Sequence, residues 1–377
     1  MNVRSIREQF PILSTKVYGK DLVYFDNAAT SQRPASVIDK WNRLTSEFNA
    51  NIHRGVHRLA EVATDEYETT RDAVRNFINA ESREEIVFTS GTTASINLVA
   101  FSFGEAFVKE GDEIIVSEAE HHSNIVPWQM LCMRKNAVLK VLRIDDNGHF
   151  NLDELKSLIT ERTRIVAVTQ ISNVLGIVNP VEEIVRICHE RNVPVLIDGA
   201  QGIVHGGMDV RKVDCDFYAF SGHKMYAATG VGVLYGKKQW LDAMPPYMGG
   251  GEMIARVRFS GTTYADTPEK FEAGTQNFAS VPTLKPAIEM MRMMQDEELQ
   301  SELENVKDYL YGKLTENENI TLYGVPRGTL SKIPLFSFSV KDVHHEDLAL
   351  ILDKMGIASR SGQMCAEPVM DRFGVTG

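Results

Sequence analysis

The chain has 377 residues, which is enough for two domains of ordinary size. Of these residues, 43% are hydrophobic and 24% are charged. This composition is typical of a globular protein and excludes a disordered chain and a small disulfide-stapled module. Acidic residues outnumber basic ones by 51 to 40, and the net charge of −11 argues against a general nucleic-acid binder.

No segment predicts a membrane span or a secretory signal. The uncharged stretch 165–181 contains the polar residues Gln170, Ser172, Asn173 and Asn179 and is shorter than the roughly 20 apolar residues of a spanning helix. The N-terminal residues are charged and lack the apolar core of a signal peptide. The four cysteines show no Cys-x-x-Cys spacing, which argues against a disulfide framework or a zinc ribbon. We therefore expect a cytoplasmic protein without membrane or metal binding.

From about Glu84 to Tyr235, short β-branched runs alternate with amphipathic stretches. The seven expected strands are 86–88, 114–116, 138–142, 165–168, 195–197, 217–220 and 232–235. Continuously apolar strands separated by helices favour an α/β fold with a mainly parallel sheet that is covered on both faces. One helix start is marked by Asn151 as N-cap, followed by Glu154.

After Val281 the pattern changes to charged helices through Leu314. Two short strands, 320–323 and 335–340, and a helix near 346–355 follow. These elements predict a smaller α+β domain. The expected organisation is an N-terminal segment over 1–20 that packs with the small domain, a large domain over 21–280, and a small domain over 281–377.

Polar residues follow five of the expected strands, at the edge where ligands bind in doubly wound sheets. The first strand runs into Thr-Ser-Gly-Thr-Thr-Ala at 89–94 and then a helix, an arrangement that suits an anion but also an ordinary helix cap. The other four strands lead to 120–124 (Glu-His-His-Ser-Asn), 172–173 (Ser-Asn), 198–201 (Asp-Gly-Ala-Gln) and 221–224 (Ser-Gly-His-Lys).

Each of these residues also has an ordinary structural interpretation. A histidine pair is most often solvated or a cap, and Asn173 can complete a turn. Asp198, directly after three apolar residues, needs a partner, which a helix cap or a cationic ring would supply. A single lysine usually lies at the surface, but burial of Lys224 would lower the pKa of its amine toward the nucleophilic range.

Together these strand ends bring an anion cradle, an imidazole, a carboxylate and a lysine to one edge of the sheet. Pyridoxal phosphate needs this set: a phosphate pocket, a stacking partner, an anion at the ring nitrogen and an amine for the Schiff base. The segment Gly230-Val231-Gly232 enters a strand instead of joining a strand to a helix, so it does not predict a dinucleotide site.

The motifs in order resemble the cysteine desulfurases of the class V aminotransferase group, of the SufS/CsdA-like (group II) type, which includes selenocysteine lyase-like enzymes. The matching segments are 24–30, 53–57, 120–128, 198–201, 221–224 and 360–368, so nearly the whole chain is covered. The resemblance implies the type I fold of pyridoxal-phosphate-dependent transferases, with a large domain and a smaller α+β domain. It also implies pyridoxal 5′-phosphate as cofactor and a homodimer with shared sites.

The resemblance assigns roles around the cofactor ring. Lys224 is expected to hold the cofactor as a Schiff base and to move protons at the substrate Cα. His121 is expected to stack on the ring and to serve in acid–base steps, while Asp198 pairs with the ring nitrogen. Asn173 and Gln201 are expected to contact the phenolic oxygen and the substrate.

The resemblance also indicates which residues bind the phosphate of the cofactor and which bind the substrate. Thr93, Ser221 and His223 are expected to bind the phosphate, together with Thr275 of the partner subunit. Arg360 is expected, with Asn173, to bind substrate.

Cys365 separates a desulfurase from its relatives. Most free cysteines are small buried hydrophobes, but Ser361-Gly362-Gln363 indicates an exposed loop beside the cationic Arg360, which suits a reactive thiol. The resemblance implies that the Cys365 thiolate attacks the sulfur of L-cysteine, so that L-alanine leaves and a persulfide remains. The persulfide would then pass to an acceptor protein of SufE or SufU type for iron–sulfur cluster assembly.

Two other functions stay open from the sequence: a selenocysteine lyase or another class V enzyme acting on a different amino acid, and a non-catalytic scaffold with the same fold. The family pattern continues past Gly377 with an arginine that binds the substrate carboxylate, so we expect the small domain as given to be truncated. Smaller departures are Ala227-Ala228 and Gln276, where relatives often carry Gly-Pro and Pro.

Overall fold

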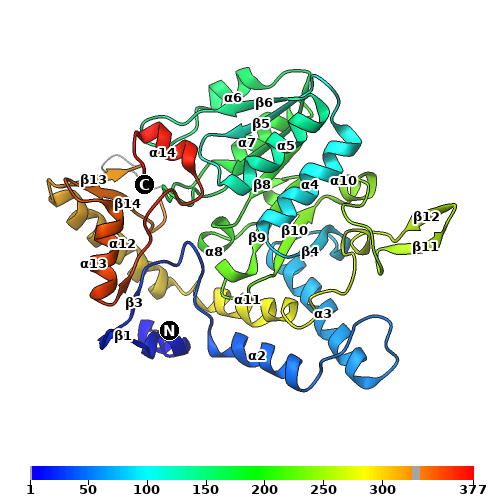
Figure 1. Ribbon diagram of the computed structural model, residues 1–377, viewed down its shortest axis with the longest axis horizontal. Helices are drawn as coiled ribbons and strands as arrows, with labels where there is room; N and C mark the ends of the chain where they lie inside the picture. Colours follow the sequence, from blue (N-terminus) through cyan, green and yellow to red (C-terminus); the bar gives the residue numbers. More distant parts are fainter. Residues whose placement is uncertain (1, 325–331) are drawn as a thin grey trace.

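The computed structural model of the chain describes residues 2–324 and 332–377, with a seven-stranded sheet at the centre (Figure 1). Its strands, in order across the sheet, are β4 (Ile86–Thr89), β10 (Gly232–Gly236), β9 (Phe217–Ser221), β8 (Val195–Asp198), β7 (Thr163–Thr169), β5 (Glu113–Ser117) and β6 (Val138–Leu142). From β9 to β6 all neighbours pair in parallel, whereas β10 runs antiparallel to both β4 and β9. The predicted α/β fold with a mainly parallel sheet is confirmed.

Helices cover both faces of this sheet. They are α2 (Ala35–Ser46), α3 (Arg58–Phe77), α4 (Thr92–Phe107), α5 (Val126–Lys135), α6 (Leu152–Leu158), α7 (Val181–His189), α8 (Gly202–His205), α9 (Val210–Val213) and α10 (Lys238–Ala243). As predicted, α6 begins after Asn151, whose Oδ1 accepts from the amides of Asp153 and Glu154.

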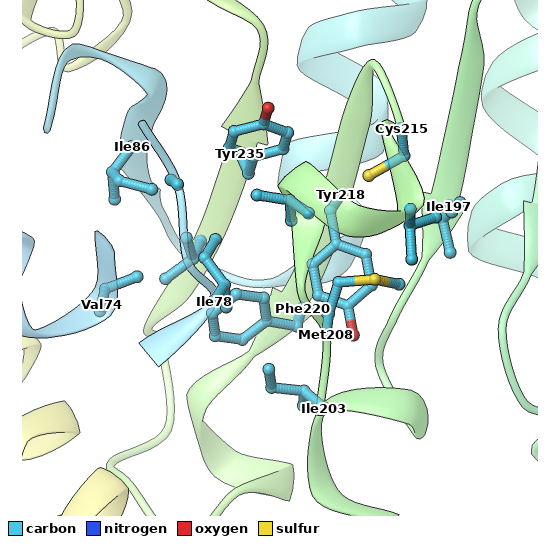
Figure 2. Close-up of a cluster of buried hydrophobic side chains, with 14 of the residues drawn as sticks. Val74, Ile78, Ile86, Ile197, Ile203, Met208, Cys215, Tyr218, Phe220 and Tyr235 are labelled. Atoms are coloured by element: carbon cyan, nitrogen blue, oxygen red, sulfur yellow. The ribbon is translucent and has the colours of Figure 1, made fainter. Parts of the chain in front are cut away.

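Successive strand residues point to opposite faces of the sheet and therefore enter two separate cores. Along β9, Tyr218 and Phe220 join a core that includes residues of α3 and α7, whereas Phe217 and Ala219 join a core with residues of α4 and α5. Figure 2 shows part of the first core around Tyr218 and Phe220. Burial on both faces explains why the sheet strands read as unbroken apolar runs.

The C-terminal part of the chain forms a smaller unit beside the sheet (Figure 1). Helix α11 (Leu284–Met293) opens this part of the chain, but it packs against α2 and α3 and joins the first core. The smaller unit itself comprises α12 (Glu297–Glu316), β13 (Ile320–Tyr323), β14 (Ser337–Val340), α13 (His345–Lys354), β15 (Ile357–Ala358) and α14 (Glu367–Phe373). Asp296 separates α11 from α12, because its side chain accepts from the amides of Glu298 and Leu299 and caps α12. The strand expected from residue 335 begins two residues later.

The N-terminal segment contacts both α11 and the smaller unit. It comprises α1 (Val3–Arg7), β1 (Lys16–Val17), β2 (Lys20–Asp21) and β3 (Val23–Tyr24). Ile6 and Phe10 pack on Met290 of α11, and β3 pairs in parallel with β15. The expected domain limits stay predictions, and residues 1 and 325–331 of those ranges lie outside the described residues.

A hairpin of β11 (Ile254–Arg258) and β12 (Gly261–Tyr264) projects from the body, far from α12 and α13 (Figure 1). Its strands are largely exposed, so the apolar pattern of the sequence does not predict them. Over the two described ranges, no helix is both long enough and apolar enough to cross a lipid bilayer.

Candidate active site

The carboxyl ends of the parallel strands open into a cavity of about 1220 Å³. The site residues expected from the sequence that line it are Thr93, His121, Asn173, Asp198, Gln201, Ser221, His223, Lys224, Arg360 and Cys365. Thr275 is exposed and does not line this cavity, and its expected contact in another subunit stays a prediction. These site residues are spread along the chain between positions 93 and 365. They meet at the cavity because each one either follows a strand that ends at this edge of the sheet or belongs to the small unit beside the sheet.

Lys224 ends the 3-10 helix η4 (Gly222–Lys224), directly after β9. Burial lowers the pKa of its amine, although the electrostatic interactions with Asp198 and Cys365 oppose that shift. A lower pKa increases the fraction of neutral amine, which is the form that adds to a carbonyl carbon. The position is therefore chemically suited to a lysine that binds an aldehyde cofactor.

Asp198 ends β8 and is 4% exposed. Burial raises the pKa of its carboxyl, whereas the Ala200 amide, 2.9 Å from Oδ1, and the charge of Lys224 lower it. Among the described residues, Oδ2 accepts no hydrogen bond. A buried carboxyl group with one open oxygen at a cavity wall fits a cationic ring nitrogen of a bound ligand.

His121 precedes the 3-10 helix η3 (His122–Asn124), and its Nδ1 accepts from the Ser123 amide at 3.0 Å. Burial, with the positive charge of Lys224 as a smaller cause, lowers the pKa of His121 to about 4. The imidazole is therefore neutral near pH 7, with its proton on Nε2. A neutral ring at the cavity wall can stack on an aromatic ligand and exchange that proton.

Hydroxyl groups gather at the first turn of the 16-residue helix α4. The Ser221 Oγ accepts from the Thr92 amide at 2.7 Å, and the Thr93 and Ser123 hydroxyls are 2.7 Å apart. The arrangement suits a phosphate, because several hydroxyls meet the start of the helix at the positive end of its dipole. Thr92 and Ser123 lacked an assigned role in the sequence analysis, although both lie in its motifs.

Close backbone packing supports this helix start. A Cβ built on Gly232 of β10 would lie 2.3 Å from the Cα of Gly91, the residue that precedes α4. Only glycine allows the antiparallel strand β10 to pass this turn. The amine, carboxyl, imidazole and hydroxyl groups of the cavity thus fit pyridoxal phosphate at its aldehyde, ring nitrogen, ring face and phosphate.

Three of the expected residues that line the cavity also contact the segment 24–30. Gln201 Nε2 donates to the Ala28 carbonyl at 2.7 Å, and His223 Nδ1 lies 3.2 Å from the Thr30 hydroxyl. Arg360 forms a two-point ion pair with Asp26, at 2.8 and 2.9 Å. Their roles toward the cofactor and the substrate stay predictions, and Asp26 had no role in the sequence analysis.

Glu120 is fully buried beneath this edge, and the sequence analysis gave it no role. Its carboxyl group accepts from the Thr169 amide at 2.8 Å and from Asn124 Nδ2 at 2.7 Å, so it joins the ends of β5 and β7. Burial raises its pKa to about 8, although these hydrogen bonds oppose the shift. Glu120 therefore supports the loop that carries His121 from the side of the loop that faces the protein interior.

Cys365 is exposed, while Cys132, Cys188 and Cys215 are buried. Burial raises the pKa of Cys132 to about 11 and that of Cys188 to about 12, so these thiols stay protonated near pH 7. Cys365 is the exposed thiol of the chain, and it lines the same cavity as Lys224.

The loop before Cys365 has an unusual backbone. Met364 and Cys365 have φ angles of 53° and 54°, a left-handed conformation that costs a non-glycine residue about 1–3 kcal/mol. Asn173 Nδ2 donates to the Met364 carbonyl at 2.9 Å, so Asn173 supports this loop in addition to lining the cavity. The loop conformation therefore depends on contacts from the sheet edge.

Residues 23–377 match the model of the class-V aminotransferase family. A probable cysteine desulfurase of Vibrio cholerae is 44% identical over 377 residues, which cover 100% of this chain and 92% of that protein. A cysteine desulfurase of Dickeya dadantii is 45% identical over a region that covers 98% of this chain and 89% of that protein.

Two solved structures of cysteine desulfurases are similar to this chain over its whole length. The cysteine desulfurase CsdA from Escherichia coli has a TM-score of 0.90 at 37% identity, and the alignment covers 100% of this chain and 92% of CsdA. The apo cysteine desulfurase from Thermococcus onnurineus has a TM-score of 0.91 at 36% identity, with the same coverage. The chain belongs to the class-V aminotransferase family of pyridoxal-phosphate-dependent enzymes, among the cysteine desulfurases.

Proposed function

We propose that this protein moves the sulfur of L-cysteine onto Cys365 as a persulfide and releases L-alanine, as a sulfur source for iron–sulfur cluster assembly. The observation that carries the proposal is that the exposed thiol of Cys365 lines the same cavity as the partly buried Lys224. A scaffold without catalytic function would not need both groups at one site.

Residues of this chain hold the cofactor and handle protons. Lys224 would bind it covalently, Asp198 would carry the counter-charge at the ring nitrogen, and His121 would stack on the ring. When bound, pyridoxal phosphate supplies an electron sink for negative charge at the substrate Cα. Lys224, once its amine is free, and His121, through Nε2, are the groups placed to move protons at the substrate.

The sulfur transfer is assigned to Cys365. Its thiolate attacks the substrate sulfur, so that a sulfur–sulfur bond forms as the bond between that sulfur and the substrate Cβ breaks. The electron pair of the broken bond stays with the substrate carbon, which takes up a proton, and L-alanine leaves. The balance is one L-cysteine and one protein thiol converted to one L-alanine and one persulfide, without any external oxidant.

We also propose a cytoplasmic homodimer that delivers its sulfur to an acceptor protein of SufE or SufU type. The exposure of Cys365 supports delivery to a protein partner. The exposure of Thr275, away from the cavity of its own chain, supports a role for Thr275 of the partner subunit at the phosphate.

The test compares alanine and sulfide production from L-cysteine in the presence of a reductant. Wild type is expected to produce the two in equal amounts. Cys365→Ala should keep its cofactor spectrum and lose at least about a hundredfold in rate, since it lacks the nucleophile. Alanine release by Cys365→Ala at the wild-type rate would refute the proposal. L-Selenocysteine as sole active substrate would favour the lyase alternative.

A further inference from the structure

His122 contacts the Cys365 loop at two points. Its backbone amide donates to the Cys365 carbonyl at 2.7 Å, and its ring Nε2 accepts from the Glu367 amide at 3.1 Å. His122 does not itself line the cavity. It therefore contacts the loop on the side away from the cavity, at the two residues that flank the fully buried Ala366.

The ring contact fixes where α14 begins. Glu367 is the first residue of that helix, and its amide has no helical carbonyl to bond. The next residue, Pro368, has no amide hydrogen at all. The His122 ring thus supplies the cap at this helix start, and Cys365 lies only two residues before it.

The hydrogen bonds also define the two neighbouring histidines. His122 accepts through Nε2, so its neutral ring carries the proton on Nδ1, whereas His121 accepts through Nδ1 and carries it on Nε2. The adjacent rings therefore serve different purposes. His121 faces the cavity, and His122 faces the loop that carries the thiol.

We propose that His122 is a positioning residue that holds Met364 and Cys365 in their left-handed conformation and sets the place of the Cys365 sulfur at the substrate. The inference rests on the proposed function and deepens it, because it names the residue on which the geometry of sulfur transfer depends. Its two contacts act together, since the amide binds the Cys365 carbonyl while the ring fixes the following helix.

The chain allows a test by side-chain length. His122→Gln places an acceptor at about the reach of Nε2, whereas His122→Asn reaches only as far as Nδ1 and His122→Ala has no acceptor. A control is His344→Ala, because the exposed His344 also caps a helix start, where its Nδ1 accepts from the Glu346 amide at the beginning of α13.

Two measurements are made on the cofactor-loaded enzymes: hydrogen exchange of the amides in 361–368 by mass spectrometry, and kcat and KM for L-cysteine. His122→Ala and His122→Asn are expected to speed exchange in this segment at least about tenfold, as the segment opens locally. They should lower kcat about 10- to 100-fold through misplacement of the thiol, with KM and the cofactor spectrum unchanged. His122→Gln and His344→Ala should behave like wild type in both.

Wild-type exchange and kcat in His122→Ala, or a His122→Gln variant as impaired as His122→Asn, would overturn the proposal. If His122→Ala does not fold, the comparison of Gln with Asn carries the same test. A wild-type enzyme that releases no alanine would instead refute the proposed function, and the exchange measurement would still decide whether His122 holds the loop.

Discussion

The buried pair of Arg71 and Glu272 allows a quantitative prediction. The side chains are 1% and 3% exposed, and the guanidinium donates to the carboxylate at 2.7 and 3.0 Å. The same carboxylate accepts from the Tyr67 hydroxyl at 2.9 Å and the Phe88 amide at 2.7 Å. Glu272→Ala therefore removes the acceptor of the Tyr67 and Phe88 donors. It leaves the buried Arg71 guanidinium with only the Glu68 carboxylate, at 3.2 Å, and the Ile86 carbonyl, at 2.8 Å.

Removal of one partner of such a buried pair costs about 3–5 kcal/mol of unfolding free energy. The assay is urea unfolding with saturating cofactor in every variant. Two controls set the scale. Glu182→Ala, which breaks an exposed pair with Lys212, should cost no more than about 1 kcal/mol. The double variant Arg71→Met/Glu272→Met should recover part of the loss, because the buried guanidinium is removed together with its partner. The Tyr67 hydroxyl and the Phe88 amide still lack their acceptor in this variant, so recovery is incomplete.

Glu272 also opens the segment that carries Thr275. Glu272→Ala should therefore weaken cofactor retention in the proposed dimer as well as stability. An unfolding free energy for Glu272→Ala within about 1 kcal/mol of wild type would refute the reasoning, since it would mean that the pair is not the buried anchor that the geometry indicates.

Three further predictions concern the cavity. The imidazole of His121 should titrate near pH 4 in an NMR titration, because burial lowers its pKa. An unfolded histidine takes up its proton near pH 6.5, so stability should fall as pH drops from about 6.5 to about 4, and a midpoint near 6.5 would contradict this burial. Iodoacetamide should alkylate Cys365 alone among the four cysteines of the native protein, and equal labelling of a buried thiol would be inconsistent with the structure. Arg360→Lys loses the two-point contact with Asp26 and should cost under about 1 kcal/mol in stability, because the pair is partly exposed. A raised KM for cysteine in that variant would support substrate binding by Arg360, and an unchanged KM would remove it from the substrate site.

The sequence predicted the cavity residues that directly follow apolar strands. Asp198 and Lys224 were placed correctly at one edge because a parallel strand end fixes a residue's position with little help from the rest of the chain. The direction of β10 was not predictable, since an apolar run reads the same in a parallel and an antiparallel strand.

Contacts between distant segments were also beyond the sequence. His122 and Glu367 are 245 residues apart, and Asp26 and Arg360 are 334 apart. No local periodicity reports such pairs, because they depend on how the small unit packs against the sheet. The burial of Glu120 belongs to the same class, since only the fold shows that its carboxyl group joins two strand ends.

The central claim is that sulfur from L-cysteine passes to Cys365 in a reaction that depends on Lys224. It is tested most directly by a single turnover with L-cysteine that carries heavy sulfur, followed by mass spectrometry of the peptide that contains Cys365. We predict one heavy sulfur on Cys365 for each alanine released, and neither product in Lys224→Ala. Alanine formed without label on Cys365, or label on one of the three buried cysteines, would contradict the account.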